Sequence, residues 1–304
     1  MIRILASDGM EKGAIAALEQ KGCEVVCRFY DPEALKEAVK EFDALVVRSA
    51  TKVRVPHIDA ACEAGRLRII IRGGVGVDNI DVKYAEEKGL IVRNTPCASS
   101  DAVAELALGH MFSVARYISA AGHSMREGGW EKKAYKGIEI TGRTVGIVGY
   151  GRIGQALGRR CQALGMSVLA YDVYRNPSLE CETMRYVELE ELLALSDIIS
   201  LHVPSLPGQP LVNADTIAQM KDGVILINTS RGNNVDEDAL LAALESGKVY
   251  GAGLDVFAEE PPKNAALLNH PRVSATPHIG ASTVEAQKRI GAEIVEILTE
   301  TFSL

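Results

Sequence analysis

The feature that most constrains the fold of this chain is a repeated alternation of short apolar runs and helical patterns. The runs are rich in β-branched residues and lack polar alternation, which indicates strands buried on both faces of a parallel sheet. Strands that alternate with helices predict an α/β fold with right-handed crossovers. In the first third of the chain, the expected strands are 2–6, 24–29, 44–47, 67–71 and 90–94.

The alternation breaks near residue 100, and we place a domain boundary there. A longer helical pattern covers 101–119 with Ser100 as its candidate N-cap, and a polar stretch with the single tryptophan, Trp130, follows. A capping box from Ser282 to Glu285 predicts a last helix that runs to the end of the chain. Between these features a second β/α series has expected strands at 144–148, 167–171, 198–202, 224–228 and 251–256.

Composition excludes several classes of protein. A net charge of −7 without a basic block argues against a nucleic-acid partner, and no apolar run is long enough to cross a membrane. The start of the chain lacks the apolar stretch of a secretory signal. The six cysteines form no C-x-x-C and the histidines show no metal-binding spacing. We therefore expect buried, reduced thiols in a cytoplasmic protein without a metal.

The sharpest local signal is a glycine fingerprint, Gly149-Tyr-Gly151-Arg-Ile-Gly154, placed between an expected strand and an expected helix. In such a motif, Gly149 permits a tight turn, Gly151 lets the backbone approach a pyrophosphate, and Gly154 allows close packing of helix and strand. The free N–H groups at the start of the helix favour phosphate. The motif alone is weak, since a structural glycine turn has the same pattern.

An acidic residue at the end of the next strand strengthens the prediction of a dinucleotide site. Asp172 follows Gly154 by 18 residues, which suits a carboxylate that accepts hydrogen bonds from the adenosine ribose. The alternative is a turn residue at a strand end. A carboxylate there repels the 2′-phosphate of NADP, although Arg175 lies close enough in sequence to soften the repulsion. We expect NAD.

Three later segments place a polar residue just beyond an expected strand, where open α/β sheets bind ligands. They contain Arg231, Glu260 and His278. Oxidation of a 2-hydroxy acid requires an anchor for the carboxylate, a base for the hydroxyl proton and a carboxylate partner for that base. The three residues have this chemistry. Each alone has a structural alternative: a satisfied histidine, a salt-bridged arginine and a solvated turn glutamate.

At these residues the sequence resembles the D-isomer-specific 2-hydroxyacid dehydrogenases. The matching strings span nearly the whole chain and include VRSATKV (47–53), GVGVDNID (74–81), NTSRG (228–232), GLDVFAEEPP (253–262) and TPHIGASTVEAQ (276–287). Several such strings in order are more specific than any one of them. Within the family, the sequence is most similar to the branch that oxidises 3-phospho-D-glycerate to 3-phosphohydroxypyruvate in serine biosynthesis.

The resemblance implies specific roles for residues of this chain. Arg231, Glu260 and His278 are the implied catalytic residues. The implied substrate residues are Arg48, Ser49, Arg72, Gly74, Val75, Arg231 and His278. The implied NAD contacts are Val75, Gly149, Gly151, Arg152, Ile153, Gly154, Asp172, His202, Val203, Pro204, Thr229, Ser230, Arg231, Asp255, His278, Gly280 and Ala281.

The resemblance also implies an architecture. It consists of two doubly wound parallel-sheet domains of the Rossmann or flavodoxin-like kind, with a cleft between them that closes on the substrate. Residues 1–98 with 282–304 form the substrate-binding domain. Residues 99–281 form the NAD-binding domain and carry the contacts of a homodimer. Because the sequence stops at Leu304, we expect no C-terminal regulatory domain.

The sequence leaves more than one substrate open. A phosphorylated 2-hydroxy acid requires a phosphate site, for which Arg48, Lys52 and Arg72 are candidates, and surface charges without a ligand are the alternative. A glyoxylate/hydroxypyruvate or D-lactate reductase is a second interpretation. A third is a non-catalytic protein that senses NAD(H) on the same fold, since fold does not imply function.

Overall fold

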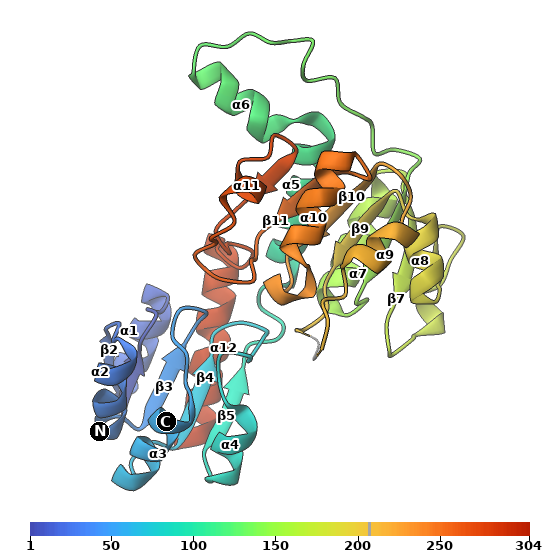
Figure 1. Ribbon diagram of the computed structural model, residues 1–304. Helices are drawn as coiled ribbons and strands as arrows, with labels where there is room; N and C mark the ends of the chain where they lie inside the picture. The colour runs from blue at the N-terminus through green and yellow to red at the C-terminus, as the bar shows by residue number, and fades with distance from the viewer. Residues whose placement is uncertain (206–207) are drawn as a thin grey trace. The chain divides into compact units, whose positions relative to one another are not determined.

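The computed structural model describes residues 1–205 and 208–304. The chain forms two compact units, drawn in Figure 1. Unit 1 comprises Met1–Ser99 and Ala281–Leu304, and unit 2 comprises Ser100–Gly280.

Unit 1 alternates strands with helices. Its elements are β1 (Arg3–Ala6), α1 (Lys12–Gln20), β2 (Glu24–Cys27), α2 (Pro32–Ala38), η1 (Val39–Glu41), β3 (Ala44–Val47), α3 (Val55–Ala64), β4 (Ile69–Arg72), α4 (Val82–Glu87), β5 (Ile91–Asn94) and α12 (Val284–Phe302). Its five strands are all parallel, in the order β2-β1-β3-β4-β5. This is the doubly wound order of flavodoxin-like sheets.

Both faces of this sheet are apolar and covered. Successive strand residues point to opposite faces, so Leu5 packs in a cluster with Leu45, while Ile4 packs in another with Ile294 of α12. Burial on two faces explains why the strands lack polar alternation. The local signal for α2 is confirmed, since the Asp31 carboxylate accepts a hydrogen bond from the amide of Ala34 at 2.8 Å ahead of Pro32.

Unit 2 contains the remaining elements. They are α5 (Ser100–Arg116), α6 (Ile118–Arg126), β6 (Thr144–Val148), α7 (Arg152–Ala163), β7 (Ser167–Tyr171), η2 (Pro177–Leu179), β8 (Met184–Tyr186), α8 (Leu189–Leu195), β9 (Ile198–Leu201), α9 (Ala214–Gln219), β10 (Val224–Asn228), η3 (Gly232–Asn234), α10 (Glu237–Ser246), β11 (Val249–Leu254), α11 (Ala265–Leu268) and β12 (Val273–Ala275).

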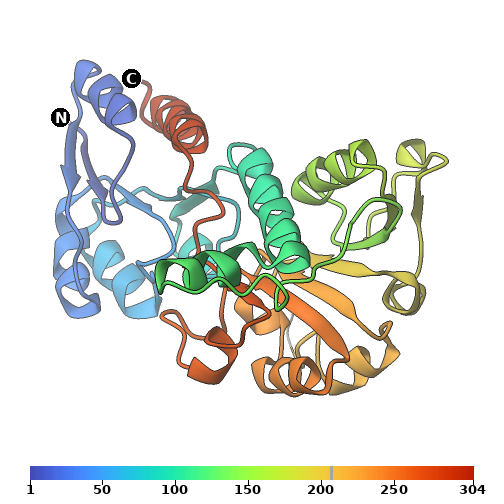
Figure 2. The same ribbon diagram turned by 90° about the horizontal axis from the view of Figure 1, so that it is seen from above.

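The seven strands of unit 2 form one parallel sheet, in the order β12-β11-β10-β9-β6-β7-β8. Its first six strands in sequence have the Rossmann order, which reverses between β6 and β9. Figure 2 shows α5 and α7 side by side on one face of this sheet, with α9 and α10 on the other. The predicted fold class, two doubly wound parallel-sheet domains, is confirmed.

Some local predictions were wrong. The strands β8 and β12 are only three residues long and carry too little pattern to stand out. The helix expected over 101–119 ends at Arg116 and restarts after Tyr117, whose φ is +55°. Ser100 lies inside α5 rather than at its cap. The cap of α12 is Thr283 instead of Ser282, since the Thr283 hydroxyl accepts the amide of Ala286 at 3.1 Å.

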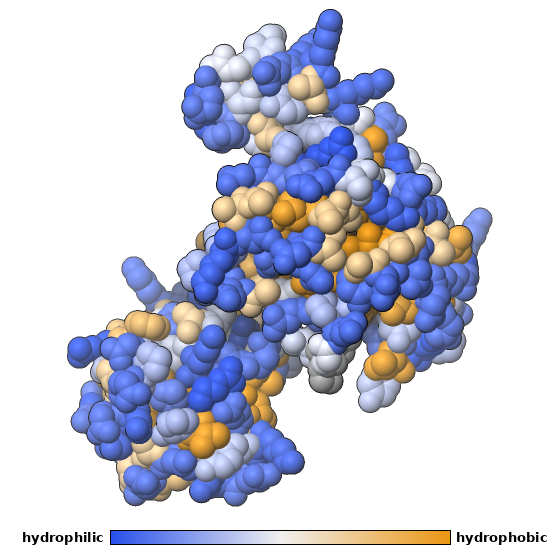
Figure 3. Space-filling view, in the orientation of Figure 1, coloured by the Kyte–Doolittle hydropathy of each residue, from blue (hydrophilic) through white to orange (hydrophobic). Residues whose placement is uncertain are grey.

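The surface is mostly polar. Figure 3 shows charged and polar side chains over most of the face in view, with apolar colour in small patches. Within residues 1–205 and 208–304, no helix is long and apolar enough to cross a bilayer. In the same residues, no group of acidic, histidine or cysteine side chains could hold a metal ion. The six cysteines are free, but Cys27, Cys97 and Cys181 are exposed, which corrects the expectation that all are buried.

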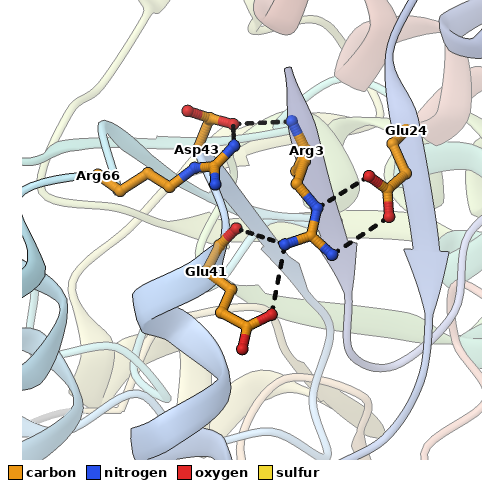
Figure 4. Close-up of polar contacts among 5 residues, drawn as sticks. All are labelled: Arg3, Glu24, Glu41, Asp43 and Arg66. Atoms are coloured by element: carbon orange, nitrogen blue, oxygen red, sulfur yellow. Dashed lines mark hydrogen bonds and ion pairs between the residues drawn. The ribbon is translucent and has the colours of Figure 1, made fainter. Parts of the chain in front are cut away.

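Charged side chains tie the strands of unit 1 together at the amino ends of β1 and β2 (Figure 4). The Arg3 guanidinium donates to Glu24 at 2.8 Å, and the Arg3 amide donates to the Asp43 carboxylate at 2.8 Å. Arg66 donates to the same carboxylate at 3.0 Å. Partial burial raises the pKa of Asp43, but the hydrogen bonds from Arg66 and the Arg3 amide outweigh it and leave that pKa below its ordinary value.

We predict that Asp43→Asn lowers the free energy of unfolding at neutral pH by about 1 kcal/mol, because two donors lose a charged acceptor. A carboxyl whose pKa is lowered on folding stabilises the native state above its unfolded pKa and loses that effect as the pH falls. The difference from wild type should therefore shrink between about pH 5 and about pH 3. Urea unfolding at several pH values measures it, and the exposed Glu63→Gln is the control. A difference that does not change with pH would contradict the assignment.

Candidate active site

The carboxyl ends of the parallel strands of unit 2 bring the predicted catalytic residues together. β10 ends at Asn228, whose buried side chain accepts the Ser230 amide at 3.0 Å and donates to the Arg231 carbonyl at 2.9 Å. This turn presents Arg231. Gly232 follows because any side chain would collide with Phe257, 1.9 Å from its Cβ position. The turn that carries Arg231 therefore lies against the segment that leads to Glu260.

His278 and Glu260 form a hydrogen-bonded pair. The distance from His278 Nδ1 to Glu260 Oε2 is 2.8 Å, and the side chains are 27% and 37% exposed. Because a carboxylate only accepts, Nδ1 carries the proton, and Nε2 of the neutral ring holds a free electron pair. His278 has a φ of +54°, a strained conformation for a residue other than glycine.

The electrostatics of Glu260 connect all three residues. Partial burial raises the pKa of Glu260, but the hydrogen bond and charge of His278, the Phe257 amide and the Arg231 guanidinium outweigh it. The pKa therefore lies below its ordinary value, and Glu260 is an anion at neutral pH.

A buried carboxylate holds the turn that carries His278. Asp255 follows β11 and is 1% exposed. Its Oδ1 accepts from the Thr276 hydroxyl at 2.6 Å and the Ile279 amide at 2.8 Å, and its Oδ2 accepts from the Gly280 amide at 2.8 Å. These donors offset the cost of burying the charge. These hydrogen bonds to the turn that carries His278 use most of the acceptor sites of Asp255, so a contact of Asp255 with the nicotinamide stays a prediction.

Of the three fingerprint glycines, two are tightly packed against backbone, and one has open space around it where a dinucleotide could bind. A Cβ on Gly149 would lie 2.7 Å from the His202 carbonyl, and one on Gly154 would lie 2.2 Å from the Gly149 carbonyl. The Cβ position of Gly151 has no atom within 4 Å. Gly151 is the N-cap of α7 and supplies no side-chain hydrogen bond. The first amides of α7 therefore face open space, as a pyrophosphate requires.

The Asp172 carboxylate, which follows β7, has the acceptor capacity that a ribose requires. It accepts from the Tyr150 amide at 2.7 Å and the Tyr174 amide at 2.9 Å, and each oxygen keeps a second acceptor site. Arg175 is paired with Glu188 at 2.7 Å. This pairing reduces its ability to compensate a 2′-phosphate, which supports NAD over NADP.

Buried polar atoms without a hydrogen-bond partner among residues 1–205 and 208–304 lie at or just beyond the ends of β9 and β10. They are Nδ1 of His202, Oγ1 of Thr229 and Oδ1 of Asn234. Burial lowers the pKa of His202 to about 4, and its Nε2 lies 2.9 Å from the Ser200 hydroxyl. Unpaired buried polar atoms are rare and often mark a ligand. Among the other predicted cofactor residues, Ser230 is buried, Ile153 and Val203 are half-buried, and Arg152 and Pro204 are exposed.

The predicted substrate residues of unit 1 gather at the carboxyl ends of β3 and β4. Val47 pairs with Arg72 in the sheet, so Arg48 and Ser49 emerge beside Arg72. The Arg48 guanidinium makes no hydrogen bond or ion pair within the described ranges. Gly74 has a φ of +151°, and a Cβ there would meet the Arg72 guanidinium at 1.4 Å. Val75 is 39% exposed.

Two side chains that the sequence analysis missed shape this edge of unit 1. The Asp8 carboxylate accepts the Arg48 amide at 2.6 Å and the Thr51 amide at 3.1 Å. The Asn79 side chain donates to the carbonyls of Arg48 and Thr51, both at 2.7 Å. Together they fix the loop from Arg48 to Thr51. Asn79 lies inside the family-like string 74–81 and Asp8 lies in none of the strings, and the role of each depends on partners 28 to 43 residues away.

Comparisons with known proteins agree with this geometry. Residues 108–280 match the model of the D-isomer specific 2-hydroxyacid dehydrogenase, NAD binding domain. The chain belongs to this family. It is therefore an oxidoreductase of the D-2-hydroxyacid dehydrogenase family, whose cofactor is NAD, as the sequence predicted.

Relatives in the family differ in their substrates. The chain is 49% identical to a hydroxypyruvate reductase of Thermotoga maritima, over 97% of this chain and 96% of that enzyme. It is 45% identical to a D-3-phosphoglycerate dehydrogenase of Methanocaldococcus jannaschii, over 97% of this chain but 56% of that protein. Among solved structures, the D-lactate dehydrogenase of Aquifex aeolicus with NAD and lactic acid has a TM-score of 0.85 at 29% identity, covering 99% of this chain and 95% of that one.

The fingerprint glycines yield a prediction that separates folding from binding. Gly151→Ala adds a methyl group in open space, so the melting temperature should stay unchanged while NADH affinity falls about tenfold or more, because the methyl group blocks the pyrophosphate. Gly154→Ala forces a contact with backbone and should lower the melting temperature as well. Differential scanning fluorimetry and NADH fluorescence titration measure both quantities.

Gly109→Ala, on α5 with no atom within 4 Å of its Cβ position, is the matched control and should change neither quantity. Undiminished NADH affinity in Gly151→Ala would contradict the placement of the pyrophosphate.

Proposed function

We propose that this family member interconverts D-2-hydroxy acids and 2-oxo acids with NAD(H), using Arg231, Glu260 and His278. The observation that carries the proposal is the 2.8 Å hydrogen bond between His278 Nδ1 and Glu260 Oε2, which leaves Nε2 with a free electron pair. A non-catalytic sensor of NAD(H) has no need for a base held in this state.

In the oxidation, His278 Nε2 accepts the proton of the C2 hydroxyl. Glu260 stabilises the resulting imidazolium through Nδ1 and holds the ring in one orientation. Arg231 binds the substrate carboxylate and the developing carbonyl oxygen through its planar donors. NAD, when held by unit 2, would supply the acceptor for the hydride that leaves C2. In the reduction, His278 returns the proton to the oxygen at C2.

We assign NAD binding to unit 2 and substrate binding largely to unit 1. Support for the first assignment comes from the fingerprint, Asp172 and the unpartnered polar atoms at the ends of β9 and β10. Support for the second comes from Arg48, Ser49, Arg72, Gly74 and Val75 at one edge of a parallel sheet, where ligands of such sheets bind.

For the substrate, we propose the pair of 3-phospho-D-glycerate and 3-phosphohydroxypyruvate, which places the enzyme in serine biosynthesis. The Arg48 guanidinium, which makes no hydrogen bond or ion pair with the described residues, supplies the charge for a phosphate, and the resemblance of the family strings agrees. The D-3-phosphoglycerate dehydrogenase relative, at 45% identity, also agrees.

The unphosphorylated pair, D-glycerate and hydroxypyruvate, is the second candidate. It has the same three-carbon skeleton and requires no phosphate site. Two observations favour it: the 49% identity to a hydroxypyruvate reductase along almost its full length, and the Asp8 carboxylate, which occupies loop amides beside Arg48 that a phosphate would otherwise bind.

We also propose that unit 2 forms a homodimer through α6 and the polar stretch after it. Figure 1 shows α6 beyond the end of α5 and away from the sheet of unit 2. It has no buried residue, and Ile118, Met125 and Trp130 are 57%, 60% and 80% exposed. Exposed apolar side chains on a projecting helix suit contact with a second copy.

The acid–base pair predicts a kinetic signature. His278→Gln should lower kcat by about 100-fold or more, because it removes the general base. Glu260→Gln should lower kcat by about tenfold, because the imidazolium formed in the oxidation loses its charged partner. The rate of NADH formation, followed by absorbance, measures both effects, and NADH affinity is the control. Equal rates in wild type and His278→Gln would remove His278 from the mechanism.

The two substrate candidates are distinguished by the ratio of kcat/KM for the phosphorylated acid to kcat/KM for the unphosphorylated acid. If the phosphorylated acid is the substrate, wild type should prefer it in kcat/KM, and Arg48→Ala should reduce that preference about tenfold or more, because a charged hydrogen bond is lost. Arg66→Ala, at the opposite edge of the sheet, is the charge-matched control. Equal losses for both substrates in Arg48→Ala would favour hydroxypyruvate, and NADH formation from neither would favour the sensor.

The dimer is tested by sedimentation. Wild type should sediment as a dimer, and Met125→Glu should shift it to a monomer, since a charge is placed in an apolar contact. Leu195→Glu, which changes a side chain of α8 that is 43% exposed, is the control and should stay dimeric. A wild-type monomer, or an unchanged dimer in Met125→Glu, would contradict the assignment of α6.

A further inference from the structure

A second histidine, outside the predicted active site, is hydrogen-bonded to the turn that carries His278. His110 lies on α5 and is 2% exposed. Gly253 of β11 admits it, because a Cβ on Gly253 would lie 2.5 Å from the His110 Cβ. The ring nitrogens of His110 both have partners: Nδ1 lies 3.0 Å from the Ser274 hydroxyl, and Nε2 lies 3.0 Å from the Thr276 hydroxyl.

The donors and acceptors in this network can be ordered. Asp255 is an anion that only accepts, so the Thr276 hydroxyl donates its single proton to Oδ1, at 2.6 Å. Thr276 must then accept from His110, which places a proton on Nε2. Burial lowers the pKa of His110, against the opposing charge of Asp255, and the ring is neutral at physiological pH. Nδ1 consequently accepts from the Ser274 hydroxyl.

We propose that His110 is a positioning residue for the acid–base reaction, acting on the His278 turn through Thr276 and Asp255. His110 donates to Thr276, Thr276 donates to Asp255, and Asp255 holds the amides of Ile279 and Gly280. The Asp255 carbonyl also accepts the His278 amide, at 2.8 Å. His110 thus stabilises, through a chain of three side chains of which His110 and Asp255 are buried, the backbone on which His278 is held at a positive φ.

The inference rests on the proposed function for its kinetic consequence only. Strain at His278 persists because its surroundings over-determine the backbone. When Thr276 loses its donor, the Asp255 carboxylate has a weaker partner, and the turn gains freedom. A misplaced general base lowers the rate of the chemical step more than it lowers substrate binding.

Two amide variants of His110 provide a matched pair. The side-chain nitrogen of glutamine reaches the place of Nε2, whereas that of asparagine reaches the place of Nδ1. We expect His110→Asn and His110→Phe to lower kcat about tenfold with less than a twofold change in KM. His110→Gln should recover most of kcat. Ser274→Ala removes the partner of Nδ1 and should lower the melting temperature without the loss in kcat.

Hydrogen exchange of the wild-type and variant chains tests the same claim without turnover. The amides of Ile279 and Gly280 should exchange about tenfold faster in His110→Asn and His110→Phe than in wild type or His110→Gln. The same effect is expected in Thr276→Val and not in Thr276→Ser.

The outcomes are distinguishable. Faster exchange in a protein that oxidises no 2-hydroxy acid would uphold the positioning role and refute the proposed function. Unchanged exchange and unchanged kcat in all folded His110 variants would overturn the inference. Equal losses in His110→Gln and His110→Asn would also overturn it, since the donor at Nε2 would then be irrelevant.

Discussion

The candidate active site depends on one topological constraint, the parallel pairing of all seven strands of unit 2. Because the strands run in one direction, their carboxyl ends meet at one edge of the sheet. Residues that are far apart in sequence, Arg231, Glu260 and His278, thereby come from neighbouring strand ends. Asp255 then fixes the last of these turns by gathering a hydroxyl and two amides on one buried carboxylate.

At the turn that carries His278, the hydrogen bonds that offset the buried charge of Asp255 also hold the strained backbone of His278. A carboxylate that is 1% exposed is costly unless donors surround it, and a histidine at positive φ is costly unless its surroundings hold it. Each offsets the other, since the amides that satisfy Asp255 belong to the residues after His278. The arrangement leaves the ring of His278 hydrogen-bonded to Glu260. The charge of Glu260 polarises the ring in a way that a neutral neighbour could not.

Much of the fold could be predicted from the sequence because its signals are local. Unbroken apolar runs identified ten of the strands, and glycine spacing identified the nucleotide-binding turn. The short strands β8 and β12 and the break at Tyr117 were missed, since each depends on packing rather than on a pattern. His110 was missed for a similar reason. In sequence it is one of several polar residues in a helical pattern, and only the fold places it beside Thr276.

The comparisons give the family and the reaction class, whereas we propose that unit 1 decides the substrate. There the Asp8 carboxylate, after β1, accepts the amide of Arg48, after β3, and the charges of the two side chains would act oppositely on an anionic ligand. Under this proposal, changes in the loop that follows β3 would alter the preference for a phosphate while the acid–base pair stays the same.

The central claim is that the residues at this edge of unit 2 transfer hydride directly between C2 of a D-2-hydroxy acid and NAD. The most direct test incubates the enzyme with NAD and D-glycerate or 3-phospho-D-glycerate carrying deuterium at C2, and analyses the NADH by mass spectrometry and NMR. The account predicts deuterium at C4 of the nicotinamide from at least one D-acid and none from the L-isomers. NADH without deuterium, or labelled NADH from the L-isomers, would contradict it.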